Sequence, residues 1–248
     1  MHMSMMPRMP LPPSRRSAAG VLLAIALVAV ALLALPGSAP TAGKIVIYGS
    51  EKGSTLTLHK KHGKIIVRGR MAHRRPRGCH FRRHHRVAVC GSRNKRVIEI
   101  KMGRRGDFVR VAEKMPMPVV VYLGAGSDKF IGNGERDICF PGGARRNRCV
   151  GRGNNDVCIT GPRNSDCVGG GGNDFCRHGT GSDGCWGGRG QDICIMGPGQ
   201  DGCHGGPGND RLYGGPQPDQ LYGGRGYDYC NGGRGTGRSH RCNVGPRH

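Results

Sequence analysis

Apolar positions recur at every ninth residue through the second half of the chain, and polar, glycine-rich stretches separate them. The step of nine is broken once, between residues 139 and 149. The recurring apolar residues are Phe130, Cys139, Cys149, Cys158, Cys167, Cys176, Cys185, Cys194, Cys203, Leu212, Leu221 and Cys230. A fixed period that repeats this often predicts a solenoid, in which short structural units stack on one another.

Each unit joins a glycine-rich half to a short apolar half, as in residues 205–213, whose sequence is GGPGNDRLY. Successive residues of a strand face opposite sides, so the middle residue of a three-residue strand is the one that points inward. Glycine adopts positive φ without steric cost, which suits the other half to tight turns. A flexible glycine-rich linker is the alternative, but a linker requires no apolar residue at every ninth position.

The unit matches the pattern G-G-x-G-x-D-x-U-x, where U is apolar and an aspartate stands two residues before most U positions. From about residue 123 to residue 233, the chain therefore resembles the hemolysin-type, or repeats-in-toxin (RTX), calcium-binding family. The resemblance implies an all-β parallel β-roll, or β-solenoid, in which two nonapeptide units form one right-handed coil. It also implies that calcium binds in the glycine-rich turns and that the U residues point into the core.

The region before the repeats, residues 44–122, shows short alternating apolar runs and no long helical period. These runs predict strands at residues 44–48, 55–59, 64–68, 86–90, 96–101, 108–111 and 119–123. Residues 106–109 are a degenerate copy of the end of the unit, as expected for the terminal units of a solenoid. We therefore expect a basic β-rich cap region at 44–95, degenerate capping coils at 96–122, the calcium-binding roll at 123–233 and a tail at 234–248.

Successive units lie on opposite edges of such a roll, so every second aspartate falls on the same edge. The first edge is unbroken and carries Asp137, Asp156, Asp174, Asp192, Asp210 and Asp228. The second edge is interrupted and carries Asp128, Asn147, Ser165, Asp183, Asp201 and Asp219. Carboxylate and carbonyl oxygens are the ligands that calcium takes. We predict calcium between turns 174/192, 192/210 and 210/228, and at most a partial site at Asp183 and Asp201.

Calcium is expected to be coupled to folding. Stacked strands lie about 4.8 Å apart, and two carboxylates at that distance repel by roughly 3 kcal/mol at an effective dielectric constant of about 20. A divalent cation between them reverses the sign of this interaction, so metal binding stabilises the folded roll. The arginine excess of the chain is expected to weaken the sites relative to an acidic member of the family.

Twelve cysteines, an even number, favour disulfides in a secreted protein. Two pairs flank the repeats, Cys79/Cys90 and Cys230/Cys242. The other eight are U residues, and cysteines on neighbouring strands of one sheet would have Cα atoms about 4.8 Å apart, within the disulfide range. The same-sheet pairs are 139/158, 149/167, 176/194 and 185/203, whereas pairing across the roll would need an unusually thin core. A reduced ladder is the alternative to disulfides. Without two C-x-x-C pairs, tetrahedral zinc is not expected.

Positive charge is concentrated before the repeats. The chain has a formal net charge of +23, and residues 44–122 hold 21 Lys and Arg against 4 Asp and Glu. The densest clusters contain Arg74, Arg75, Arg77, Arg82, Arg83 and Arg86. Such clusters favour binding to an anionic cell-surface polymer, although the aromatic residues common in nucleic-acid binders are scarce. Polyanion binding through residues 44–122, with the roll as scaffold, is therefore the alternative function.

The N-terminus resembles a targeting segment. Arg8, Arg15 and Arg16 precede an apolar run from Val21 to Leu35, and small residues follow as far as Gly43. A run of this length is short for a membrane span and typical of a signal-peptide core. We expect residues 1–43 to be a signal peptide with its cleavage region and the protein to be extracellular; an uncleaved anchor is the alternative.

No catalytic spacing of the G-x-S-x-G, H-E-x-x-H or P-loop type occurs in the chain. Histidines 73, 80, 84 and 85 lie in the basic region, where a solvated loop is the simplest interpretation. The sequence therefore predicts a non-enzymatic, secreted calcium-binding protein without a small-molecule substrate.

The residues on either side of each U position point outward, and on one sheet they are mostly apolar. The predicted outer stripe comprises Ile138, Phe140, Val157, Ile159, Phe175, Ile193, Ile195, Tyr213 and Tyr229. An apolar stripe of this size favours homo-oligomerisation or docking. Scattered surface apolar residues without a role are the alternative.

Overall fold

The computed structural model describes residues 43–74, 78–143, 146–235 and 237–242, which belong to one compact unit. Every helix or strand in these residues is a β-strand, so the predicted all-β class is confirmed. The predicted signal segment lies outside the described residues except for Gly43. No helix within the described ranges is long and apolar enough to cross a membrane.

The first of two sheets has nine strands, all parallel to their neighbours. In sheet order they are β1 (Lys44–Tyr48), β6 (Val97–Lys101), β8 (Val119–Tyr122), β10 (Ile138–Phe140), β12 (Val157–Ile159), β14 (Phe175–Arg177), β16 (Ile193–Ile195), β18 (Arg211–Gly215) and β20 (Tyr229–Gly233).

The second sheet has twelve strands. In sheet order they are β21 (Arg238–His240), β19 (Gln220–Arg225), β17 (Gly202–Pro207), β15 (Gly184–Arg189), β13 (Ser165–Gly171), β11 (Asn147–Gly153), β9 (Lys129–Ile131), β7 (Phe108–Val111), β2 (Thr55–Lys61), β3 (Lys64–Gly69), β5 (Val87–Gly91) and β4 (Cys79–Arg82). Pairing is parallel from β21 to β2 and antiparallel from β2 to β4.

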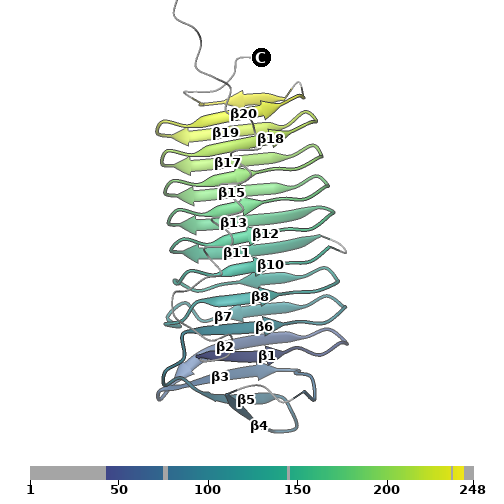
Figure 1. Cartoon of the computed structure of the whole chain (residues 1–248), viewed down its shortest axis with the longest axis vertical. Helices are drawn as coiled ribbons and strands as arrows, with labels where there is room; N and C mark the ends of the chain where they lie inside the picture. The colour runs from purple at the N-terminus through teal and green to yellow at the C-terminus, as the bar shows by residue number, and fades with distance from the viewer. Residues whose placement is uncertain (1–42, 75–77, 144–145, 236, 243–248) are drawn as a thin grey trace, which may run out of the picture. The chain divides into compact units, whose positions relative to one another are not determined.

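Successive strands of the repeat region alternate between the two sheets, so two units make one coil (Figure 1). The register is one coil per eighteen residues, with Cys167 opposite Cys185 and Cys185 opposite Cys203 on neighbouring strands. Each U residue from Phe130 to Cys230 is buried, because it is the inward residue of its strand. These findings confirm the predicted parallel β-roll.

The N-terminal region extends the same two sheets. Strand β1 pairs with β6 over five residues, and its Ile45 and Ile47 join the core that runs to Cys230. The strands expected in residues 44–122 are present, each within two residues of the predicted ends, and β4 is an additional one. Strands β2 to β5 form antiparallel hairpins at the N-terminal end of the second sheet (Figure 1).

The disulfides inside the roll differ from the predicted ones. The structure pairs Cys139 with Cys149, Cys167 with Cys176 and Cys185 with Cys194, each across the roll. The prediction of same-sheet pairs was wrong because neighbouring side chains in one sheet point the same way, whereas cysteines of facing strands point at one another. The core is thin enough for this pairing, with Cα–Cα distances of 6.3 to 6.5 Å.

The cysteines that flank the repeats form the two local disulfides, Cys79–Cys90 and Cys230–Cys242. Cys158 and Cys203 carry free thiols and are buried. The structure therefore contains neither a fully reduced cysteine ladder nor one in which every cysteine is paired.

The two outer faces of the roll differ in exposure. The apolar side chains predicted to form a stripe on the nine-stranded sheet are half-buried, except for Val157, which is buried. On the other sheet, Trp186 is 41% exposed and begins a column of parallel rings that continues through His204, Tyr222 and His240. The apolar stripe is present, and its role in self-association stays a prediction.

Candidate calcium-binding ladder

Aspartates of the first edge form a continuous ladder along the roll. Each one stands immediately before a short strand. Its Oδ1 accepts a hydrogen bond from the backbone N–H of the residue at the same position one coil earlier, which is Val119 for Asp137 and an aspartate for the others. The N–H of Asp174 donates to Asp192 and that of Asp192 to Asp210, both at 2.8 Å. The ladder runs from Asp137 through Asp228 without a gap. Each bond links two successive coils, so the ladder stabilises the stack even without metal.

The second edge has the same construction but contains a break. The N–H of Asp183 donates to Asp201 at 2.8 Å, and the N–H of Asp201 donates to Asp219 at 3.0 Å. The break lies between Asn147 and Ser165, because the N–H of Asn147 donates to the carbonyl of Asn164 instead of to a carboxylate. On the N-terminal side of the break, Asp107 and Asp128 bond in the same way as the other ladder aspartates.

The second carboxylate oxygen of these aspartates is buried and has no hydrogen-bond partner among the described residues. Such unpartnered Oδ2 atoms belong to Asp128, Asp156, Asp174, Asp183, Asp192, Asp201, Asp210, Asp219 and Asp228. A buried, unpaired oxygen of this kind costs free energy, and a bound cation would satisfy it. The ladder therefore presents a regular row of oxygen ligands.

Burial disfavours the charged form of these carboxyls. Desolvation, partly offset by the backbone hydrogen bond, raises the pKa of Asp174 to about 7 and that of Asp192 and Asp210 to about 6. The pKa of Asp156 is raised further, to about 9, by desolvation first and then by the nearby carboxylates of Asp137 and Asp174. Without metal these aspartates therefore keep their protons to higher pH than ordinary carboxyls, and a divalent cation would favour their ionised form.

A glycine five residues before each aspartate of the first edge leaves room in front of its Oδ2. A Cβ on Gly169, Gly187 or Gly205 would come within 3.0 Å of the carboxylate of Asp174, Asp192 or Asp210. At Gly205 that Cβ would also lie 2.6 Å from the carbonyl oxygen of Gly223, one coil later. Carboxylate and backbone carbonyl oxygens thus face one small cradle, and this is the ligand set that calcium prefers.

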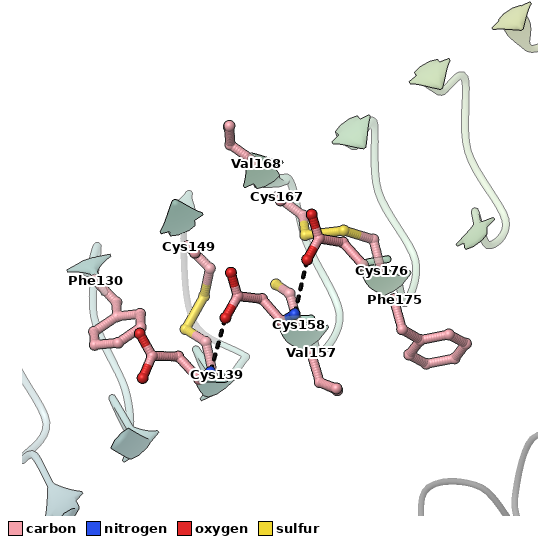
Figure 2. Close-up of a pocket in the computed structure, with 14 residues that line it drawn as sticks. Phe130, Cys139, Cys149, Val157, Cys158, Cys167, Val168, Phe175 and Cys176 are labelled. Carbon is pink, nitrogen blue, oxygen red and sulfur yellow. Dashed lines mark hydrogen bonds between the residues drawn. A yellow bond between two sulfur atoms is a disulfide. The ribbon is translucent and has the colours of Figure 1, made fainter. Parts of the chain in front are cut away.

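A hollow of about 10 Å³ lies in the core beside the first edge. Its lining is mostly apolar and includes Phe130, Cys139, Cys149, Cys158, Cys167 and Cys176, with Asp137, Asp156 and Asp174 at its border. This volume is about that of one water-sized sphere. In Figure 2 the dashed lines are the ladder bonds from the N–H groups of Asp137 and Asp156 to the next carboxylates. The hollow itself is part of the apolar core, whereas the glycine cradles with their carboxylate oxygens are what fits a small, hard cation.

Side chains fill most of the equivalent cradles on the second edge. The residues five positions before Ser165, Asp183 and Asp201 are Thr160, His178 and Met196, which are buried. His178 Nδ1 lies 3.9 Å from Asp183 Oδ1, and burial lowers the pKa of this histidine to about 4, so it is neutral. The partial site expected at Asp183 and Asp201 therefore lacks the open cradle of the first edge.

Asp219 is the exception on the second edge, because a glycine, Gly214, stands five residues before it and leaves an open cradle. One coil further on, however, the ladder position is Gly237, which supplies no carboxylate. The sequence did not single out this cradle, although the step of eighteen residues would have revealed it.

A family model for the RTX calcium-binding nonapeptide repeat matches four copies in this chain, at residues 168–185 and 204–238. The chain carries RTX calcium-binding repeats. The matched residues include Asp174, Asp210 and Asp228 of the first edge. Asp192 lies between the two matched stretches, and its hydrogen bonds with Asp174 and Asp210 continue the ladder across that gap. No curated protein and no solved structure matches the chain.

The aspartate ladder also extends to coils before the residues that the family model matches. Asp107, Asp128 and Asp137 hold the same ladder position as the aspartates of the RTX repeats. The sequence placed Asp128 and Asp137 on the two edges and Asp107 in a degenerate unit, but the predicted calcium sites did not include them. Asp128 and Asp137 follow the nine-residue step, whereas Asp107 precedes Asp128 by 21 residues, which is longer than one coil of eighteen. The described residues thus form an RTX-type β-roll whose aspartate ladder continues into the coils before the matched repeats.

The arginines proposed as polyanion contacts gather at one end of the roll. Arg82, Arg83 and Arg86 are exposed in the β4–β5 hairpin, and Arg74 is exposed with its guanidinium 4.6 Å from the centre of the Tyr48 ring. Arg75 and Arg77 lie outside the described residues. Among the residues that the structure describes, the ion pairs of Lys and Arg are those of Lys44 and Lys101 with Glu99, so the hairpin arginines have no carboxylate partner there.

Proposed function

We propose that this protein is a secreted, non-enzymatic calcium-binding protein whose β-roll takes up calcium along its first edge and is stabilised by it. The observation that carries the proposal is the unbroken ladder of buried aspartates, in which Asp156, Asp174, Asp192, Asp210 and Asp228 each have an unpartnered Oδ2 beside a glycine cradle. The RTX repeats support the choice of calcium. The disulfides support an oxidising compartment outside the cytosol.

The first-edge carboxylates are the groups that would hold the metal. Asp174, Asp192, Asp210 and Asp228 belong to successive coils, and each carboxylate faces a glycine cradle. At Gly169 and Gly205 the carbonyl of a glycine one coil later lies at the same cradle. Bound calcium supplies positive charge and satisfies oxygens that are otherwise buried without partners. Asp156 extends this set by one coil, whereas Asp183 and Asp201 have filled cradles and contribute less.

Calorimetric titration of the full chain with calcium tests this function. We expect binding in the range of about 10⁻⁴–10⁻³ M that is common for extracellular calcium modules. Magnesium at the same concentrations is the control, because it demands tighter octahedral geometry than flexible turns provide. Absence of calcium binding at 10 mM, about ten times the upper end of that range, would remove the proposed function.

A second candidate function is binding to an anionic extracellular polymer through the basic end of the roll. It is favoured by the exposed arginines of the β4–β5 hairpin, which lack carboxylate partners among the described residues. The test is retention on a heparin column, comparing the wild-type chain with the variant Arg82→Ser/Arg83→Ser/Arg86→Ser. Retention that survives these changes at equal salt would assign the binding to another surface.

A further inference from the structure

The interior of the roll contains a ladder of eight cysteines, from Cys139 to Cys203, in which six form disulfides and two do not. Each disulfide joins two successive units across the roll. The unpaired cysteines, Cys158 and Cys203, are buried and lie at positions equivalent to those of the bonded ones. The geometry of the repeat therefore does not determine which neighbour a given cysteine selects.

Each free thiol lies next to a disulfide. Figure 2 shows the sulfur of Cys158 between the Cys139–Cys149 and Cys167–Cys176 bonds. At the other end, the sulfur atoms of Cys185, Cys194 and Cys203 all lie within 4.8 Å of one another. A thiol held this close to a disulfide is placed for exchange with it, since exchange proceeds by attack of one sulfur on another.

We propose that this ladder is an internal thiol relay, which exchanges disulfide partners along the roll and takes up one further disulfide. The fully paired state would contain the bonds 139–149, 158–167, 176–185 and 194–203. Every one of these joins successive units across the roll, as the present bonds do. No coil has to move to another position for the change.

The exchange steps conserve both electrons and protons. The Cys203 sulfur loses its proton and attacks Cys194, so the 194–203 bond forms, the 185–194 bond breaks and Cys185 takes up a proton. The Cys185 sulfur then attacks Cys176, which forms the 176–185 bond and leaves Cys167 as the thiol. The two thiols of the ladder are then Cys158 and Cys167, on facing strands of successive units.

The last step is a two-electron oxidation and requires an external oxidant, for which we name a small-molecule disulfide such as oxidised glutathione. The Cys158 and Cys167 thiols form a disulfide, and the oxidant is reduced to two thiols, which carry the two protons. Without this oxidant the relay moves the free thiols but does not remove them.

The variant Cys158→Ser tests the relay without any oxidant, because it leaves one thiol in the ladder. The full chain is incubated at neutral pH, quenched with acid, unfolded and alkylated, and the labelled cysteine is identified by mass spectrometry. The chain has an Arg or Asp between every two successive ladder cysteines, so trypsin and an Asp-specific protease together separate them all. The relay predicts label on Cys167 and Cys185 as well as on Cys203.

The variant Cys203→Ser is the matched control from the other end, and the relay predicts label on Cys176 and Cys194 in addition to Cys158. If either serine variant fails to fold, the corresponding alanine variant replaces it. In the wild type, oxidised glutathione should lower the free thiols in the ladder from two to none. Label confined to Cys203 in the first variant and to Cys158 in the second, with two thiols left in the oxidised wild type, would overturn the proposal.

Discussion

At the scale of single residues, a ladder aspartate has three partners: the metal, a backbone N–H one coil earlier and a glycine five residues before it. The sequence predicted only the metal. The metal-ligand role of Asp192 follows from the repeat pattern. Its hydrogen bond from the N–H of Asp174 does not, because it depends on the stacking of coils eighteen residues apart. The steric requirement for glycine at position 187 does not follow from the repeat pattern either; the missing Cβ of Gly187 leaves space for the Asp192 carboxylate. The glycine thus has a steric role, separate from any positive φ.

The variant Asp192→Ala should bind calcium more weakly than the wild type, by about ten-fold or more. Loss of a charged ligand costs roughly 1.5–3 kcal/mol, and each 1.4 kcal/mol is a factor of about ten. The matched control is Asp201→Ala on the second edge, where Met196 fills the cradle. Calorimetric titration measures both, and equal losses of affinity would contradict the distinction between the two edges.

The variant Gly187→Ala should destabilise the roll by about 1–3 kcal/mol and weaken calcium binding, because the added methyl group overlaps the Asp192 carboxylate. Gly202→Ala is the control, since a Cβ there meets nothing within 4 Å. Neither glycine has a positive φ, so backbone strain does not separate them. Denaturant unfolding of both variants measures the difference, and equal stabilities would argue against the cradle.

At the scale of the structural elements, the short strands were predictable and their disulfides were not. Alternation of apolar residues identified β1, β2, β3 and β5 to β8 within a residue or two, because only one face of each strand is buried. Strand β4, with the half-buried Cys79 and Phe81, has too weak an alternation to be recognised. The disulfide pairing depends on the thickness of the core, a property of two facing sheets that no single strand encodes.

The aspartate ladder gives the metal-free roll a definite pH dependence. The pKa values of Asp174 and Asp201 are raised to about 7 by desolvation, above their ordinary values in an unfolded chain. The folded state therefore binds more protons than the unfolded state, and stability falls as pH rises from about 4 through about 7. Urea unfolding in a chelator should give a lower free energy of unfolding at pH 8 than at pH 5. A higher value at pH 8 would contradict the burial of these carboxyls.

At the scale of the whole molecule, a single core of one buried residue per unit extends from Ile45 to Cys230. Each coil contacts its neighbours through parallel pairing, ladder bonds and disulfides. Calcium bound at one coil is therefore expected to stabilise the neighbouring coils as well. The repeat period allowed this architecture to be predicted. The continuity of the basic N-terminal region with the roll was only partly predicted, because its antiparallel hairpins lack the nine-residue step.

Thermal unfolding of the full chain with and without calcium, in wild type and in the variant Asp174→Asn/Asp192→Asn/Asp210→Asn, is the most direct test of the central claim. At a calcium concentration about 100-fold above Kd, each site should stabilise the wild type by about 2.7 kcal/mol, which raises Tm by several degrees. The variant removes three first-edge charges at nearly constant shape, so its Tm should respond little to calcium. An equal rise of Tm in the two proteins, or none in the wild type, would contradict a calcium-stabilised first edge.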